Sequence, residues 1–172
     1  MKIFQAVMIT LLVSLIIIIS IISSASAFPQ YEITNSSCNC IIFRMDDIQD
    51  FWIQQGQIHP MEVFKSKNLS LSLGIIMNSM GNDSKILNTV RDGAFRNLFE
   101  PAIHGWNHVI YTNMTPSQQE ESLILANKKM VKLFGNSSDI FIPPENAFNS
   151  ATIESMEKVG LRIISSDMYN EN

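Results

Sequence analysis

The chain has 172 residues, of which 46% are hydrophobic and only 16% are charged. Lys2 is the only charged side chain in residues 1–27, and the 145 residues that follow suffice for one domain with a real core and are too few for two ordinary domains. The net charge of −4 and the absence of any Lys/Arg cluster argue against a nucleic-acid-binding surface.

The amino-terminal segment, residues 1–27, has the composition of an export signal. A lone basic residue precedes a long apolar run, and Ala25-Ser26-Ala27 has the A-x-A form of a cleavage site. As a helix the run from Ile3 to Ile22 would reach roughly 30 Å, which is about a bilayer core, so an uncleaved signal anchor is the alternative to a cleaved signal peptide. We expect the rest of the chain to be secreted or anchored to the outer face of the cytoplasmic membrane, with membrane contact only through this segment if it is uncleaved.

Residues 28–39 form a polar linker, and a C-x-C pair, Cys38 and Cys40, lies at its end. This spacing is too tight for an ordinary disulfide and too sparse for a zinc knuckle, so we interpret the pair as the start of a buried strand, with a redox or intermolecular role as the alternative. N-x-[ST] sequons agree with export, although chance also produces them in an Asn- and Ser-rich chain. They begin at Asn35, Asn68, Asn82, Asn113 and Asn136.

From residue 40 onward, short apolar runs alternate with helix-like stretches. The apolar runs predict strands at 40–45, 69–77, 101–103, 140–142 and 161–166. The stretches between them predict helices at 60–64, at 85–97, from Pro116 to Phe134, and from Asn149 or Ser150 to Gly160. The third helix has the clearest signals, with Thr115 as its N-cap and Gly135 at its end. Its predicted apolar face consists of Leu123, Ala126, Met130, Val131 and Phe134.

This order is typical of parallel βα units, whose functional residues follow the carboxyl ends of the strands. The sequence therefore predicts an α/β fold with about five βα units, in a domain that covers residues 40–172. Polar residues stand at three of the strand ends: Asp46-Asp47, His104 with His108, and Pro143-Pro144-Glu145-Asn146.

The first two sets together predict a metal site. Adjacent carboxylates on an extended backbone point in different directions, so one of Asp46 and Asp47 can bind a metal while the other faces water; a solvated acidic turn is the alternative. The H-x-x-x-H spacing places both imidazoles on one side of a helical turn, where they can share a cation. One carboxylate and two imidazoles leave coordination positions open, as a catalytic divalent metal requires.

These segments resemble the motifs of a known family. Phe43-Arg44-Met45-Asp46-Asp47 is similar to the T-F-D-D-G motif of polysaccharide deacetylases, carbohydrate esterase family four, and His104 to His108 resembles their H-[ST]-x-x-H motif. Ile142-Pro143-Pro144-Glu145 lies where the family has its R-P-P-Y-like motif. The resemblance covers about residues 40–166 and implies a distorted or partial (β/α) barrel of the polysaccharide deacetylase type.

The resemblance implies a metal-dependent hydrolase that removes N-acetyl groups from a carbohydrate polymer. Asp47, His104 and His108 would hold the divalent metal, for which Zn²⁺ is expected, and Asp46 would be the general base. Trp106 would offer an apolar face to a sugar ring or would pack in the barrel wall. Pro144 and Glu145 are the further candidates for contact with the substrate.

The chain also departs from the family pattern. The arginine that orients the base carboxylate in the family is matched by Ile142, and the aromatic that follows is matched by Glu145. Arg44 lies on the strand before the base, and whether it replaces that arginine stays open. No histidine follows His108 to match the family's late general acid, a loss that typically costs about 10²- to 10⁴-fold in rate.

The short length and the lack of the family's late histidine and third-motif arginine leave alternatives open for the fold and the function. A barrel of this type needs roughly 200 residues at the lower end, so 145 residues indicate either a fold that closes differently or an incomplete copy. A non-catalytic glycan- or metal-binding surface protein on the same fold is the second candidate. A membrane-anchored structural protein is the third, and it rests only on the apolar amino terminus.

Overall fold

The computed structural model describes residues 41–167. The predicted export signal and linker, and both cysteines, lie outside the described residues, as do residues 168–172. Within the described part, no helix is both long enough and apolar enough to cross a membrane.

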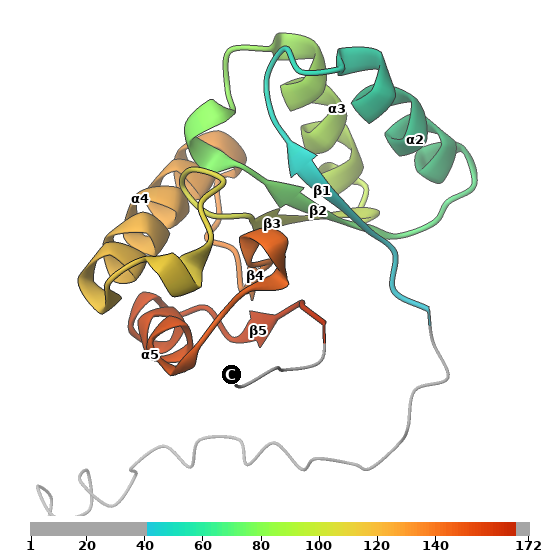
Figure 1. Ribbon diagram of the computed structural model, residues 1–172. Coiled ribbons are helices and arrows are strands. Elements are labelled where there is room, and N and C mark those ends of the chain that lie inside the picture. The colour runs from blue at the N-terminus through green and yellow to red at the C-terminus, as the bar shows by residue number, and fades with distance from the viewer. Residues whose placement is uncertain (1–40, 168–172) are drawn as a thin grey trace, which may run out of the picture. The chain divides into compact units, whose positions relative to one another are not determined.

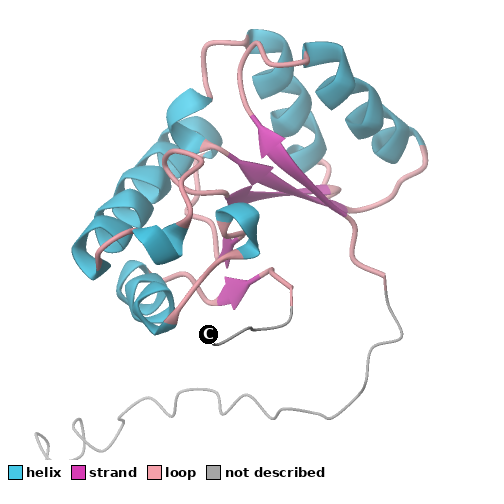
Figure 2. Ribbon diagram, viewed as in Figure 1, coloured by secondary structure: helices cyan, strands magenta, loops and turns pink. Residues whose placement is uncertain are grey.

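A five-stranded parallel sheet forms the centre of this part, with its strands in sequence order (Figures 1 and 2). The strands are β1 (Arg44–Ile48), β2 (Leu71–Ile75), β3 (Phe99–Ile103), β4 (Ile140–Phe141) and β5 (Ile163–Ile164). Every neighbouring pair is parallel, and no pairing among the described residues joins β1 to β5. The predicted α/β class and the partial barrel are therefore confirmed, and β1 and β5 are its two open edges.

Helices connect the strands, as parallel pairing requires. They are α2 (Gln54–Ser66), α3 (Ser84–Phe95), α4 (Pro116–Phe134) and α5 (Ser150–Val159). Three short 3-10 helices lie at the carboxyl end of the sheet: η1 (Met77–Ser79), η2 (Tyr111–Asn113) and η3 (Pro144–Asn146). In Figure 1, α2 packs beside α3 on one flank, and α4 packs beside α5 on the other.

The helix ends follow the predicted chemistry. Thr115 and Asn149 each cap a helix with a capping box, and Gly135 and Gly160 end the same two helices in left-handed conformations. A glycine adopts this conformation without steric cost, so the two C-termini stop where expected.

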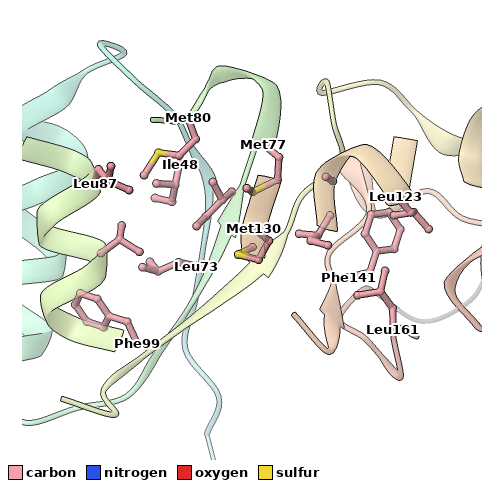
Figure 3. Packing of buried hydrophobic residues seen from close by; sticks show 14 of the residues in the cluster. Ile48, Leu73, Met77, Met80, Leu87, Phe99, Leu123, Met130, Phe141 and Leu161 are labelled. Carbon is pink, nitrogen blue, oxygen red and sulfur yellow. The ribbon is translucent and has the colours of Figure 1, made fainter. Parts of the chain in front are cut away.

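The main core lies between the helices and the sheet (Figure 3). In Figure 3, Ile48 and Leu73 lie beside Leu87 and Phe99, whereas Phe141 lies beside Leu123 and Leu161, and Met77 and Met130 lie between the two groups. A second, small cluster consists of Ala102, Ile140 and Ile142. The opposite face of β1 and β2 is left for polar groups, because alternate residues of a strand point to opposite faces.

Two predicted element boundaries and one predicted buried residue are wrong. The first strand begins at Arg44 and runs through Asp46-Asp47, whereas Ile41 and Ile42, predicted to be buried, are 80% and 78% exposed because they precede the pairing with β2. The helix predicted at 60–64 extends over 13 residues and contains Pro60. Val131, predicted on the apolar face of α4, is 46% exposed.

Candidate active site

Asp46 and Asp47 lie at a bulge in β1. The register of β1 against β2 shifts between Met45 and Ile48, and Asp47 has a left-handed φ of 62°. A bulge re-aims side chains, and a non-glycine residue held at positive φ is strained in a way that is found mostly at functional sites. The two carboxylates diverge here: Asp46 lies over Gly74 of β2, and Asp47 points toward the histidines that follow β3.

His104 and His108 lie on a loop, so the predicted helical turn is wrong. Gly105 has a φ of 79°, and its carbonyl accepts a hydrogen bond from the backbone N–H of Met77 over 3.1 Å. The loop therefore bonds to the end of β2 instead of forming a helical ladder. Both imidazoles nevertheless lie on one side, with ring centroids 5.0 Å apart.

Asp47, His104 and His108 meet at the carboxyl edge of the sheet. Oδ1 of Asp47 lies 3.4 Å from Nε2 of His104 and 3.2 Å from Nε2 of His108. One ligand atom from each residue lies within 4.8 Å of the other two. His104 is buried, whereas the side chains of His108 and Asp47 are 34% and 40% exposed, so the cluster is open to solvent on one side.

The backbone of β4 orients His104. Nδ1 of His104 lies 2.7 Å from the carbonyl oxygen of Ile142. A carbonyl only accepts, so the proton is on Nδ1 and the lone pair of Nε2 faces Asp47. Burial is the largest influence on this ring and holds the pKa of His104 below its ordinary value, which keeps the imidazole neutral, as a metal ligand must be.

The three residues fit a divalent cation. Imidazole nitrogens and a carboxylate oxygen are zinc ligands, and two ligand atoms at about 2.0–2.1 Å from a tetrahedral ion lie roughly 3.3 Å apart. The separations of 3.4 and 3.2 Å match this value. The described residues bring together the three predicted ligands and add no fourth.

Asp46 is bound by an arginine of its own strand. Oδ2 of Asp46 accepts from Nη2 of Arg44 over 2.9 Å, whereas Oδ1 is buried and has no hydrogen-bond partner among the described residues. The Oδ1 atom faces Gly74, where an added Cβ would lie 3.0 Å away. Asp46 also lies near enough to His104 to influence the charge of that ring.

An open hollow of about 440 Å³ adjoins the cluster, and Asp47 and His108 are part of its wall. Trp52, which the sequence interpretation missed, lines the same hollow and is 45% exposed. The signal for it is the apolar triplet 51–53, which begins four residues after Asp47, with Phe51 and Ile53 also exposed. Both of these neighbours have positive φ, so the triplet forms a strained loop at the site.

The predicted substrate residues have different surroundings. Trp106 is partly buried against the core, with Nζ of Lys129 5.5 Å from its ring centroid. Pro144 is buried in η3, and Glu145 is exposed with a φ of 55°. Their contact with a substrate stays a prediction.

Comparison with known protein families matches residues 63–164 to the family described as polysaccharide deacetylase. The matched segment contains both histidines of the site and begins after Asp46 and Asp47. A search of curated proteins finds no match.

Several solved structures share the fold. A family 4 carbohydrate esterase from Streptomyces lividans in complex with acetate has 15% identity and a TM-score of 0.59, over 75% of this chain and 64% of that one. The Streptococcus pyogenes deacetylase PplD in complex with acetate has 11% identity and a TM-score of 0.61, over 74% and 57%. BA3943, a CE4 family pseudoenzyme from Bacillus anthracis, has 12% identity and a TM-score of 0.60, over 72% and 42%. The chain thus spans less than two thirds of the length of each of these structures.

Proposed function

The chain belongs to the polysaccharide deacetylase family, and on this premise we propose that it is a metal-dependent hydrolase that removes N-acetyl groups from a carbohydrate polymer. The observation that carries the proposal is the meeting of Asp47, His104 and His108 beside Asp46, at the carboxyl edge of a parallel sheet. This edge is where enzymes of such folds have their active sites.

Asp47, His104 and His108 hold the cation, with Zn²⁺ as the proposed metal because of the donor set. A divalent cation at this place supplies a water of lowered pKa and polarises the acetamide carbonyl. His104 is held in the required tautomer by the Ile142 carbonyl, so this ligand needs no reorganisation when the cation binds.

Asp46 is the general base. It forms an ion pair with Arg44 of the same strand and is not among the three residues whose atoms converge for a cation, so its carboxylate would accept the proton of the attacking water. The described residues hold no further imidazole at the site, because His59 is exposed on α2. Asp46 then returns the proton to the leaving amine, and one carboxylate serves both steps.

The substrate is an N-acetylated polysaccharide that lies along the open hollow beside Asp47 and His108. Trp52 presents an exposed apolar surface there, suited to the face of a sugar ring. Trp106, Pro144 and Glu145 remain candidates for contacts farther along the polymer.

A second candidate function is a non-catalytic glycan- or metal-binding surface protein on the same fold. The observation in its favour is that the described residues place only two imidazoles at the site, with no separate acid for the leaving amine. Metal binding without acetate release would distinguish this candidate from the hydrolase.

The proposed setting is extracytoplasmic: residues 1–27 are a signal peptide or anchor, 28–39 a linker, and 40–172 the deacetylase-like domain. The acidic charge balance agrees with a carbohydrate partner and not with nucleic acid. Mass spectrometry of the exported protein tests this proposal, because cleavage predicts a mature form that begins at Phe28, whereas an anchor predicts the full chain in the membrane fraction.

The experiment that tests the function is acetate release from N-acetylglucosamine oligomers by the full chain, after chelation and again after Zn²⁺ is restored. If the protein is a hydrolase, chelation abolishes acetate release and added Zn²⁺ restores it. The Asp46→Asn variant releases no acetate under the same conditions. Stoichiometric Zn²⁺ binding with no acetate above the metal-free control would reject it in favour of the binding protein.

A further inference from the structure

The Arg44 side chain makes polar contacts with two further residues besides Asp46. Its Nη2 lies 2.9 Å from Oδ2 of Asp46 and donates to Oδ1 of Asn146 over 3.0 Å. Its Nη1 donates to the carbonyl oxygen and to Oγ of Ser165, over 2.9 and 3.2 Å. A planar guanidinium with several donors in a fixed geometry is suited to such simultaneous contacts, which a lysine could not reproduce.

These contacts connect the two open edges of the sheet. Arg44 begins β1, whereas Ser165 directly follows β5 and Asn146 ends η3 after β4 (Figure 1). Asn146 is itself held, since its carbonyl accepts from Oγ of Ser166 over 2.9 Å. The guanidinium is therefore fixed from the far edge of the sheet, and its place does not depend on Asp46 alone.

The other side of the carboxylate has no comparable restraint. Oδ1 of Asp46 is buried against Gly74 and has no hydrogen-bond partner among the described residues. The contact of Oδ2 with Arg44 is thus the one polar contact recorded for this carboxylate in the described part of the chain, and it determines which way the group faces. Both side chains are about one quarter exposed, 25% and 28%, so the pair lies at the rim of the site and not on the outer surface.

We propose that Arg44 is the positioning residue of the general base: anchored by Ser165 and Asn146, it holds the Asp46 carboxylate in its productive orientation. The inference rests on the proposed function, in which Asp46 is the base. Arg44 is not among the residues that converge for a cation or line the hollow beside them, and its proposed effect on the reaction passes through Asp46. A clamp that only joins β1 to β5 would act on the fold and would not need Asp46.

A double-mutant cycle separates these roles, because residues that act through one another have non-additive effects. The variants are Arg44→Met, Asp46→Asn and the combination, in the full chain with Zn²⁺ bound. Arg162→Met is the matched control, because Arg162 is an exposed arginine whose ion pair with Asp139 lies elsewhere on the surface.

A displacement of about 1 Å at a reacting group can cost about 100-fold in rate. We therefore expect Arg44→Met to lower kcat for acetate release by about 10- to 100-fold, with KM and Zn²⁺ stoichiometry unchanged. Arg44→Lys should recover part of the loss, and Arg162→Met should match the wild type. In the Asp46→Asn background, Arg44→Met should lower kcat no further.

An Arg44→Met kcat within twofold of the wild type would overturn the inference, as would an equal additional loss in the Asp46→Asn background. Should Arg44→Met fail to bind Zn²⁺ because it does not fold, Arg44→Lys takes its place in the cycle, and an equal additional loss of kcat in the Asp46→Asn background then overturns the inference. A Zn²⁺-loaded wild type that releases no acetate overturns the proposed function and this inference together. Turnover in the wild type with an additive cycle overturns the inference alone.

Discussion

The carbonyl oxygen of Ile142 accepts a hydrogen bond from Nδ1 of His104 over 2.7 Å. The backbone at the end of β4 thereby sets the tautomer of a side chain at the end of β3, two strands that are neighbours in the sheet. Because the restraint comes from the main chain, Nε2 of His104 faces Asp47 without the need for a cation to orient the ring. The same edge carries Asp46 and Asp47, so the sheet brings the proposed ligands, the proposed base and the orienting carbonyl to one place.

The two histidines should be needed for metal binding. Loss of an outer partner of a metal ligand costs 10- to 100-fold in affinity, so loss of a ligand itself should cost at least about 100-fold. We predict this loss for His104→Gln and for His108→Gln, measured as Zn²⁺ affinity against a chromophoric chelator. His59→Gln is the control, because His59 is exposed on α2. Unchanged affinity in either site variant would contradict the assignment.

The two adjacent aspartates should separate into a base and a ligand. Asp46→Asn should keep one Zn²⁺ per chain and lose about 10²- to 10⁴-fold in kcat, the usual contribution of a general base. Asp47→Asn should lose the metal, because Oδ1 of Asp47 is within 3.4 Å of both imidazoles. Metal analysis and acetate release on the same samples test the pair, and a reversed pattern would show that the roles are exchanged.

Gly74 should be required for the position of the base. A Cβ at this residue would lie 3.0 Å from Oδ1 of Asp46 and 3.3 Å from Cδ1 of Ile142, closer than ordinary contacts. We expect Gly74→Ala to lower kcat by about 10-fold or more through displacement of Asp46, since a shift of about 1 Å can cost 100-fold. Gly56→Ala in α2 is the matched control, because its Cβ would meet nothing closer than 3.5 Å. Equal kcat in both variants would count against the placement of Asp46.

Trp52 should contribute to substrate binding. Its exposed side chain lines the hollow beside Asp47 and His108, and contacts of an aromatic ring are worth about 0.5–1.5 kcal/mol beyond area burial. Trp52→Ala should therefore raise KM for N-acetylglucosamine oligomers by about 3- to 10-fold and leave kcat nearly unchanged. Phe95→Ala removes an exposed aromatic outside this hollow and should leave KM unchanged. A wild-type KM in the Trp52→Ala protein would show that the Trp52 side chain does not contact the substrate.

Asp83 should make stability depend on pH. Burial raises the pKa of Asp83, but hydrogen bonds from the Gln54 side chain and from the backbone N–H groups of Ile86, Lys85 and Phe51 outweigh it and leave the pKa below the ordinary 3.8. A carboxyl with a lowered folded-state pKa stabilises the fold above its ordinary pKa, and this contribution is lost as the pH falls through the folded-state value. Asp83 also caps α3 and is bonded to the loop that carries Trp52.

We predict that Asp83→Ala lowers the free energy of unfolding by about 1–2 kcal/mol at pH 7, the usual effect of a lost N-cap. The difference from the wild type should shrink at pH 3. Urea unfolding at the two pH values measures it, with Asp139→Ala as a surface control that should change little. A difference of the same size at both pH values would show that the charge of Asp83 does not contribute.

Local signals predicted the second half of the fold well. Side chains cap the starts of α4 and α5 at Thr115 and Asn149, and left-handed glycines end the two helices at Gly135 and Gly160. Both signals depend only on residues that are near in the sequence. The parallel pairing of the strands followed from the alternation of apolar runs with helices, because parallel strands need such crossovers. The two histidines were found because they directly follow a predicted strand.

Non-local pairing explains what the sequence did not reveal. Acidic residues are poor strand formers, so the strand was predicted to end before Asp46, although pairing with β2 carries it to Ile48. Because the predicted strand ends before Asp46, the sequence left open whether Arg44 and Asp46, two residues apart, lie on one face of it. The carbonyl of Ile142 and the anchors on Ser165 and Asn146 come from distant segments and have no local sequence signal.

The most direct test of the central claim is the rate of acetate release along a Zn²⁺ titration of the chelated full-length protein. If hydrolysis depends on a cation held by Asp47, His104 and His108, the rate of acetate release rises in proportion to bound Zn²⁺. It stops rising at one ion per chain. A rate that stays at the metal-free level while one ion binds would contradict the claim.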